Sequence, residues 1–162
     1  MTKLKKQLTN TTNSMAVNNM KRNLLKWVCF LAYLLFLGYV LFYSAGFGRT
    51  EHEEYRYNLV LFQEIGRYYH FGMRTGSWNL FIWNVIGNIV VFMPFGMFLP
   101  SLISRCRNVL FTAILSLEMS LCVEVVQLVT RVGSFDVDDL LLNTLGGICG
   151  CIVYTIYKWI KR

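Results

Sequence analysis

Four long apolar stretches alternate along the chain with more polar segments. They cover roughly residues 24–42, 80–103, 109–129 and 140–159. Each holds roughly 20 mostly apolar residues, which is the length that a helix needs to cross the hydrocarbon core of a bilayer. Because lipid offers no partners to backbone polar groups, the stretches should fold as helices and associate as a bundle. The pattern predicts four transmembrane helices.

Composition agrees with this interpretation. Hydrophobic residues make up 55% of the 162 residues and the mean hydropathy is +0.44, which is too apolar for a water-soluble domain of this size. The formal net charge is +7, but the basic residues gather at the ends of the apolar stretches, where membrane topology accounts for them. We therefore expect membrane lipids, and no nucleic acid, as partners of these charges.

Basic segments set the predicted orientation. They precede the first stretch, separate the second from the third and follow the fourth, whereas acidic residues are mixed into the other two connections. Because cytoplasmic segments carry an excess of Lys and Arg, the sequence predicts a multi-pass protein of the cell membrane with both termini cytoplasmic. The basic residues concerned are Lys3, Lys5, Lys6, Lys21, Arg22, Lys26, Arg105, Arg107, Lys158, Lys161 and Arg162.

The start of the chain differs in composition from the rest. The first 20 residues are rich in Asn, Thr and Lys and show no apolar period, which predicts a disordered cytoplasmic tail over 1–20 and a transmembrane domain over 21–162. A basic start followed by an apolar run also describes a signal peptide, and cleavage near Ser44 or Ala45 is the alternative. The apolar run is longer than the core of a usual signal peptide, which favours a retained anchor.

The connection between the first two stretches, roughly residues 48–77, is too long for a simple turn. Leu59, Phe62, Ile65 and Tyr69 recur in it at near-helical spacing with polar residues between them. This period predicts an amphipathic helix lying in the outer headgroup layer. A disordered outer loop is the alternative. The expected fold class is all-α: a polytopic membrane bundle of four transmembrane helices with an outer interfacial amphipathic segment.

The second stretch carries two amides and several helix-disrupting residues. Asn84 and Asn88 are four residues apart, so they share one face in the outer half of this helix. Pro94 cannot donate a backbone hydrogen bond, and Gly87 and Gly96 leave room for a neighbouring backbone. We therefore expect a kink or break here. Broken membrane helices often border binding sites, although kinked helices that only pack are also common.

Polar residues of the third and fourth stretches should meet these asparagines near the outer leaflet. The third stretch ends with three polar residues along one helical stripe, and the fourth opens with four more. Ionisable groups at membrane depth are costly and by default mark a functional site. We predict one outer-facing ligand-binding site. Its candidate residues are Asn84, Asn88, Glu124, Gln127, Arg131, Asp136, Asp138, Asp139 and Asn143.

Three other features are assigned no chemistry. Gly146, Gly147 and Gly150 form a smooth face on the fourth stretch, which predicts ordinary helix contact. Glu118 lies nearer the bilayer centre and six residues from Glu124, so the two are not expected to share a face. The five cysteines are not placed for an exported disulfide or a zinc site.

The order and spacing of several short motifs resemble those of the VanZ-like family, membrane proteins first associated with teicoplanin resistance. The motifs are Asn58-Leu59, Asn84-x-x-Gly87-Asn88, Phe92-x-Pro94-x-Gly96, Glu124-x-x-Gln127, Asp136-x-Asp138-Asp139 and Asn143-Thr-x-Gly146. One of them alone would be a weak signal, but the set is specific. Leu61 departs from the pattern, because the family commonly has proline there. The resemblance implies a bacterial cell-envelope protein linked to antibiotic resistance, and it implies no particular reaction.

Two mechanisms are open for the predicted site. In the first, the protein is a non-enzymatic binding or shielding module that acts on an envelope glycolipid, a lipid-linked precursor or the access of a lipoglycopeptide, and it needs no cofactor. We favour this one because the chain lacks a nucleophile motif, a phosphate-binding Gly loop and a spaced His cluster.

In the second mechanism, the protein is a membrane enzyme or flippase-like protein acting on a phosphate-bearing, lipid-linked substrate. Glu124, Asp136, Asp138 or Asp139 would act as a base or hold a divalent cation that bridges the phosphate. A third interpretation is purely structural, with the polar residues only holding the helices together.

Overall fold

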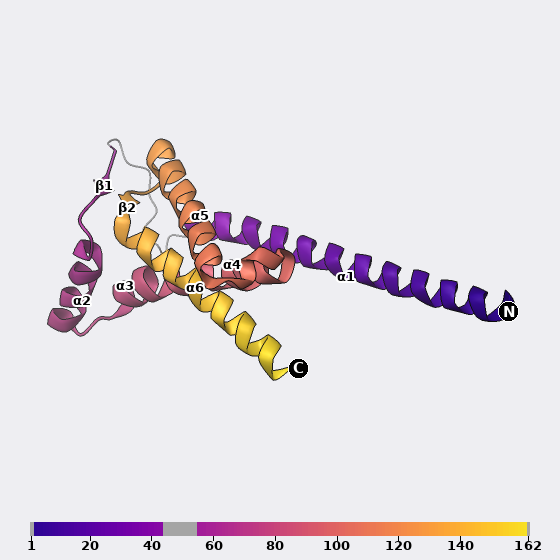
Figure 1. Ribbon diagram of the computed structural model, residues 1–162. Coiled ribbons are helices and arrows are strands. Elements are labelled where there is room, and N and C mark those ends of the chain that lie inside the picture. Colours follow the sequence, from indigo (N-terminus) through magenta and orange to yellow (C-terminus); the bar gives the residue numbers. More distant parts are fainter. Residues whose placement is uncertain (1, 44–54, 162) are drawn as a thin grey trace.

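Four long apolar helices dominate the computed structural model, which describes residues 2–43 and 55–161, with side chains over 15–42 and 55–161. In this part of the chain the potential membrane spans are Met15–Phe42, Asn79–Leu102, Val109–Thr130 and Val137–Ile160. The predicted all-α membrane bundle is confirmed (Figure 1). The elements are α1 (Thr2–Tyr43), β1 (Tyr57–Asn58), α2 (Gln63–Thr75), α3 (Asn79–Phe81), the π-helix η2 (Ile82–Ile86), α4 (Gly87–Leu102), the 3-10 helix η3 (Ser104–Arg107), α5 (Val109–Thr130), β2 (Phe135–Asp136) and α6 (Val137–Ile160).

Helix α6 lies across α4 and α5 and contacts both (Figure 1). A Cβ atom built on Gly150 of α6 would lie 1.9 Å from the carbonyl oxygen of Met93 on α4. One built on Gly96 of α4 would lie 1.8 Å from the carbonyl oxygen of Gly147 on α6. Only glycine allows the two backbones to approach so closely. The predicted glycine contact face of the fourth span is confirmed.

The second half of α1 packs along α4 and α5. Leu37 and Leu41 of α1 are buried in one hydrophobic cluster with Phe92 and Val123. The Tyr33 hydroxyl donates a hydrogen bond to a backbone carbonyl oxygen of α4 at 2.9 Å. Helix α1 is therefore held to the bundle by both apolar burial and a polar contact.

The first half of α1 differs from the prediction. Residues 2–20 continue the helix of the first span, whereas their composition predicts a disordered tail. No proline or glycine interrupts residues 2–37, and the Lys, Leu and Met residues that recur there favour helix, so the helix propagates toward the N-terminus. This half projects from the bundle as a single helix, and residues 15–25 are exposed (Figure 1). The alternative cleavage site at Ser44 or Ala45 lies outside the described residues.

The second span is not broken at Pro94, where its proline and glycine residues predict a kink or break. Helix α4 runs through Pro94 and Pro100 without interruption. The irregular turn lies earlier, in η2, where the Gly87 N–H donates to the Ile82 carbonyl oxygen five residues back. A proline removes only one backbone hydrogen bond, and α1 and α6 pack on α4 around it, which holds the helix together. Turns of the π type are frequent at functional sites, and this one contains Asn84.

The connection between α1 and the second span contains the predicted amphipathic helix. Its polar and apolar residues separate onto opposite faces of α2. Leu59 and Phe62, which the predicted helical period included, precede the helix. Trp78, at the start of the second span, packs against α2 through the Tyr69 ring. Residues 48–54 of the predicted outer segment lie outside the described part of the chain.

The two ends of the bundle differ in charge. We term the acidic end the one where α5 ends and α6 begins, and the basic end the one where α6 ends. The carboxylates of the acidic end are Glu64, Glu124, Asp136, Asp138 and Asp139, and the basic residues of the basic end are Lys26, Arg105, Arg107, Lys158 and Lys161. The positive-inside rule predicts that the basic end is cytoplasmic, and that orientation stays a prediction.

Candidate functional site

Most of the predicted site residues lie together at the acidic end and are buried. Glu124 and Asp138 are each 1% exposed, and Asn88 is equally buried. Burying a polar group is costly unless its hydrogen bonds are satisfied, and burying a charge is more so. The hydrogen-bond partners of these buried side chains are therefore the basis for interpreting the site.

Asp138 binds the N-terminus of α2. Its carboxylate accepts hydrogen bonds from the backbone N–H groups of Phe62, of Glu64 at 2.9 Å and of Ile65 at 3.1 Å. The first N–H groups of a helix have no partner within the helix, and the N-cap residue of α2 provides no side-chain acceptor. A negative charge at this position also interacts favourably with the helix dipole. Asp138 thus fixes α2 in place, although 76 residues separate it from Phe62.

The segment just before α2 is exposed and apolar. Leu59, Val60, Leu61 and Phe62 are all exposed, and we term them the apolar loop. Phe62 has a left-handed backbone with φ 64°, which is rare for a bulky residue and persists only where the surroundings hold it. The hydrogen bond from its N–H to Asp138 is one such constraint. The same carboxylate that fixes α2 therefore also fixes the end of the apolar loop.

Asp136 joins the short strand pair to α6. Its side chain accepts hydrogen bonds from the Asp138 N–H at 2.8 Å, which caps α6, and from the Asn58 amide at 3.0 Å. Strands β1 and β2 pair in parallel here, with Asn58 opposite Asp136. The Asp136 N–H donates to Oε2 of Glu124 at 2.9 Å. Burial raises the pKa of Asp136 above its usual value, and the two hydrogen bonds to its carboxylate oppose that rise.

Two amides of the site link neighbouring helices. Nδ2 of Asn88 donates to Oδ1 of Asp139 at 2.6 Å, which connects α4 to α6. Nε2 of Gln127 donates to the carbonyl oxygen of Leu41 at 2.8 Å, which connects α5 to α1. These bonds place polar groups of all four spans at one level of the bundle. The sequence pattern predicted this for the second, third and fourth spans, and the first span joins them through a backbone carbonyl.

Two predicted site residues lie apart from the others. Nδ2 of Asn84 donates to the carbonyl oxygen of Leu80 at 2.9 Å, within its own helix. Arg131 is exposed at the C-terminal cap of α5, and its guanidinium lies 4.6 Å from the ring centroid of Tyr55. The structure therefore brings together a smaller set, which we term the polar cluster. Its members are Asn88, Glu124, Gln127, Asp136, Asp138, Asp139 and Asn143.

Sequence reasoning left two polar side chains out of the candidate site. Asn58 bonds to Asp136, and Oγ of Ser120 accepts a hydrogen bond from Nδ2 of Asn143 at 2.9 Å. Asn58 belongs to one of the motifs that carry the family resemblance, which was the available signal. Ser120 lies four residues before Glu124, and that spacing puts both on one face of α5.

The polar cluster keeps unused hydrogen-bond acceptors. Among the described residues, the buried polar atoms without a partner are Oδ1 of Asn88, Oγ of Ser116, Oε1 of Gln127 and Oδ1 of Asn143. Such atoms are uncommon in folded proteins, and they can accept hydrogen bonds from water or from a ligand. No three His, Cys, Asp or Glu side chains of the described residues converge as metal ligands. The cluster thus retains acceptors that are available to a hydrogen-bond donor.

Glu118 does not belong to the polar cluster. It is exposed on α5, whereas Glu124 on the same helix is buried, so the prediction that the two do not share a face is confirmed. Glu118 therefore provides a natural comparison for the buried carboxylates.

Comparisons with known proteins place this arrangement in context. A family model described as VanZ/LLP1 matches residues 30–158, which include every candidate site residue. Among curated proteins, Protein VanZ from Enterococcus faecium is 32% identical over 77 residues, covering 43% of this chain and 43% of that protein. The chain thus spans less than half the length of this curated relative. No solved structure matches the chain.

Proposed function

Because this chain belongs to the VanZ/LLP1 family, we propose that it is a non-enzymatic membrane module that lowers the sensitivity of the cell envelope to lipoglycopeptides such as teicoplanin. Its acidic end binds or shields an envelope glycolipid or lipid-linked precursor at the outer leaflet. The reaction-free mechanism is the simplest one that agrees with the partners of the buried carboxylates.

The observation that carries the proposal is the contact between Asp138 and α2. A general base must lie within hydrogen-bond reach of the substrate, and Asp138 is buried. The carboxylate of Asp138 instead accepts three backbone N–H groups, and that of Asp136 caps α6. These carboxylates position α2 and the apolar loop, and they are not disposed for proton transfer to a substrate.

The apolar loop and α2 supply a surface suited to lipid. Exposed apolar side chains next to an amphipathic helix insert among headgroups and acyl chains. Both lipid-linked precursors and lipoglycopeptides carry a hydrocarbon chain that can contact such a surface. The unpaired amide oxygens of the polar cluster can accept hydrogen bonds from a polar headgroup at the same end of the bundle.

The proposal requires the acidic end to face outward. The basic segments of the sequence support this orientation through the positive-inside rule. A reporter that is active only outside the cell, fused after the last residue, should stay inactive. An active C-terminal reporter would contradict both the orientation and the proposed outer-leaflet site.

Susceptibility measurements test the proposal directly. Expression in a susceptible bacterial host should raise tolerance to teicoplanin more than tolerance to a glycopeptide that lacks an acyl chain. Asp138→Asn and Asp139→Asn should weaken this effect at normal membrane abundance, and Glu118→Gln, which changes an exposed carboxylate, should not. Full tolerance at normal abundance with Glu124, Asp138 and Asp139 all neutralised would leave the cluster a structural role only.

The enzymatic alternative is favoured by one observation. Asp139 is only half-buried and lies next to the unpaired oxygen of Asn88, so a substrate has access to a carboxylate there. Mass spectrometry of lipid-linked precursors separates the two mechanisms. Precursors that are chemically altered only with the wild-type chain would favour an enzyme. Unaltered precursors, together with a lipid that copurifies with wild type and not with Glu124→Gln, would support binding.

A further inference from the structure

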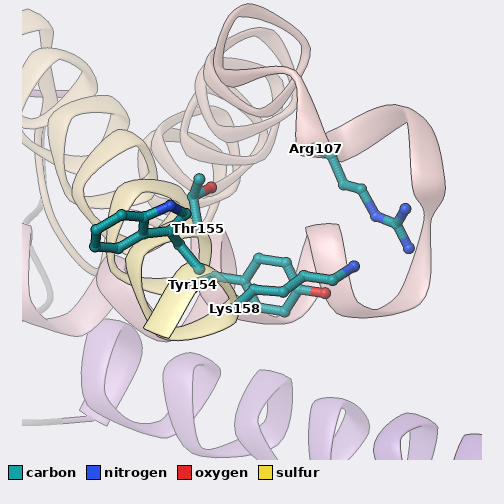
Figure 2. A pocket seen from close by; sticks show the side chains of 5 residues that line it. Arg107, Tyr154, Thr155 and Lys158 are labelled. Atoms are coloured by element: carbon teal, nitrogen blue, oxygen red, sulfur yellow. The ribbon is translucent and has the colours of Figure 1, made fainter. Parts of the chain in front are cut away.

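A cavity of about 250 Å³ opens at the basic end, where η3 meets the last turns of α6. Its lining residues are Arg107, Tyr154, Thr155, Lys158 and Trp159. Figure 2 shows the Arg107 guanidinium, the Lys158 ammonium and the Tyr154 hydroxyl directed toward the same space. The polar cluster lies at the opposite end of the bundle, so this cavity is separate from the site of the proposed function.

The fold holds the two walls of this cavity together. Cys106 of η3 is fully buried, and its carbonyl oxygen accepts hydrogen bonds from Oγ1 of Thr112 at 2.7 Å and from Sγ of Cys151 at 3.7 Å. Cys151 belongs to α6, so η3 is fastened to that helix. Three of the lining residues follow Cys151 by three, four and seven positions and therefore share its face. Arg107 directly follows Cys106, which brings its side chain to the same place.

The two cations of the cavity lack a protein counter-charge. The sequence contains no Asp or Glu in residues 65–117 or 140–162. Within the part of the chain that the structure describes, neither Arg107 nor Lys158 forms an ion pair or hydrogen bond with a protein group. Two positive charges that face one space repel each other, and an anion between them removes that repulsion. Since no described acidic side chain faces these cations, an anion from outside the chain can bind between them.

We propose that this cavity binds the phosphate of an anionic phospholipid headgroup. Arg107 donates hydrogen bonds to two phosphate oxygens, a geometry that guanidinium favours. Lys158 adds a second charge, and the Tyr154 hydroxyl adds a neutral donor. The volume is below the roughly 300–1,000 Å³ of pockets for drug-sized ligands, which suits a headgroup and excludes a whole lipid. Basic pockets between helices at a membrane surface are known sites for such headgroups.

The surroundings of the cavity favour a lipid over a soluble phosphate ester. Ile152 and Ile156 are exposed on α6 in the two turns before Lys158, where acyl chains of a bound lipid can lie. Trp159 is 77% exposed beside it, and tryptophan is enriched at the boundary between headgroups and hydrocarbon. A lipid can therefore use the charges and the apolar surface together, whereas a soluble ester can use only the charges.

Native mass spectrometry of the purified full chain tests this site. The wild type in mild detergent should retain phosphatidylglycerol more than phosphatidylcholine with the same acyl chains. Arg107→Gln combined with Lys158→Gln should reduce phosphatidylglycerol retention about tenfold or more. The charge-preserving pair Arg107→Lys and Lys158→Arg should retain most of it. A melting temperature of the Gln pair equal to that of wild type without lipid would show that its loss of binding is not loss of fold.

A matched control separates the cavity from general surface charge. Arg105→Gln with Lys161→Gln also removes one arginine and one lysine charge from the basic end, but neither residue lines the cavity. This pair should bind phosphatidylglycerol within about twofold of wild type. Equal losses in the two double variants, or equal retention of phosphatidylcholine by the wild type, would overturn the proposal. Displacement of the lipid by millimolar glycerol phosphate would identify a soluble ester as the ligand and overturn it as well.

Discussion

The acidic and basic ends of this bundle hold their charges in opposite ways. At the acidic end, the carboxylates of Glu124, Asp136 and Asp138 are buried and accept hydrogen bonds from backbone N–H groups. At the basic end, Arg107 and Lys158 are exposed, and among the described residues they have no protein partner. The first group builds the fold, and the second group is available to a partner outside the chain.

The difference follows from side-chain length and from the cost of burial. Short carboxylates placed near the ends of helices cannot reach water easily, so backbone N–H groups must satisfy them. Long Lys and Arg side chains can extend their charge to the membrane surface while their stems stay in apolar surroundings. Neutralising a residue should therefore disturb the fold at the acidic end and leave it unchanged at the basic end.

Asp138→Asn should produce the largest effect, because the amide keeps one acceptor oxygen where the carboxylate accepts three N–H groups. Hydrogen bonds to charged groups contribute about 1.5–3 kcal/mol each, so backbone amides of α2 should exchange roughly 30-fold faster or more. Hydrogen exchange of the protein in lipid nanodiscs measures this. The amides of α4 and α6 should change little.

Asp139→Asn is the matched control for that variant. Asp139 is the neighbouring residue and accepts a hydrogen bond from Asn88, whereas the backbone N–H groups at the start of α2 bond to Asp138. Its replacement leaves the carboxylate that accepts the three N–H groups in place, so the exchange of α2 should stay within about threefold of wild type. Equal acceleration in both variants would mean that α2 responds to the total charge of the acidic end and not to the Asp138 contact.

Glu124→Gln and Glu118→Gln compare a buried and an exposed carboxylate on one helix. Glu124 accepts the N–H of Asp136, and replacing it disturbs a buried acceptor, which should lower the free energy of unfolding by about 1–3 kcal/mol. Among the described residues Glu118 forms no hydrogen bond or ion pair, so its replacement removes no such contact and should change that energy by less than about 0.5 kcal/mol. Thermal unfolding in detergent gives both values. Similar losses would erase the distinction between the two positions.

The architecture was predictable because it depends on local pattern. The length of the apolar stretches predicted the four spans, and helical spacing of apolar residues predicted α2. The small residues Gly146, Gly147 and Gly150 predicted the contact face of α6. The helix over residues 2–20 was not predicted, because composition suggested disorder, while these residues contain nothing that stops a helix from propagating out of the span.

The candidate site was predictable in position and less so in its contacts. The positions of Asn88, Glu124 and Asp139 along their spans predicted that all three lie at the same depth in the membrane. The bond from Asp138 to α2 joins residues 76 positions apart, and its donors are backbone groups that any sequence would supply, so no side-chain pattern could reveal it. Asn84 shares a face with Asn88 in a regular helix, but the π turn of η2 changes that register.

Asp136→Asn should give a smaller, pH-dependent effect. Burial raises the pKa of Asp136 above 3.8, so the folded state binds this proton more tightly than the unfolded chain does. Stability from this group is therefore complete below pH 3.8 and is lost as pH rises through the folded-state pKa. The Asn variant has no carboxylate to ionise and does not lose this stability. Its melting temperature, measured relative to that of wild type, should therefore rise as the pH increases from 3.8 through the folded-state pKa. A difference that is constant with pH would contradict the raised pKa.

The smallest effect on folding should come from the basic end. Arg107→Gln with Lys158→Gln removes two exposed charges that the described part of the chain leaves unpaired, so the free energy of unfolding in neutral detergent should change by less than about 0.5 kcal/mol. Added phosphatidylglycerol should then stabilise the wild type and not this variant, because a ligand that binds only the folded state raises its stability. Melting curves with and without the lipid measure both quantities. A large loss of stability without lipid would show that charges at the basic end also build the fold, and the contrast between the two ends would disappear.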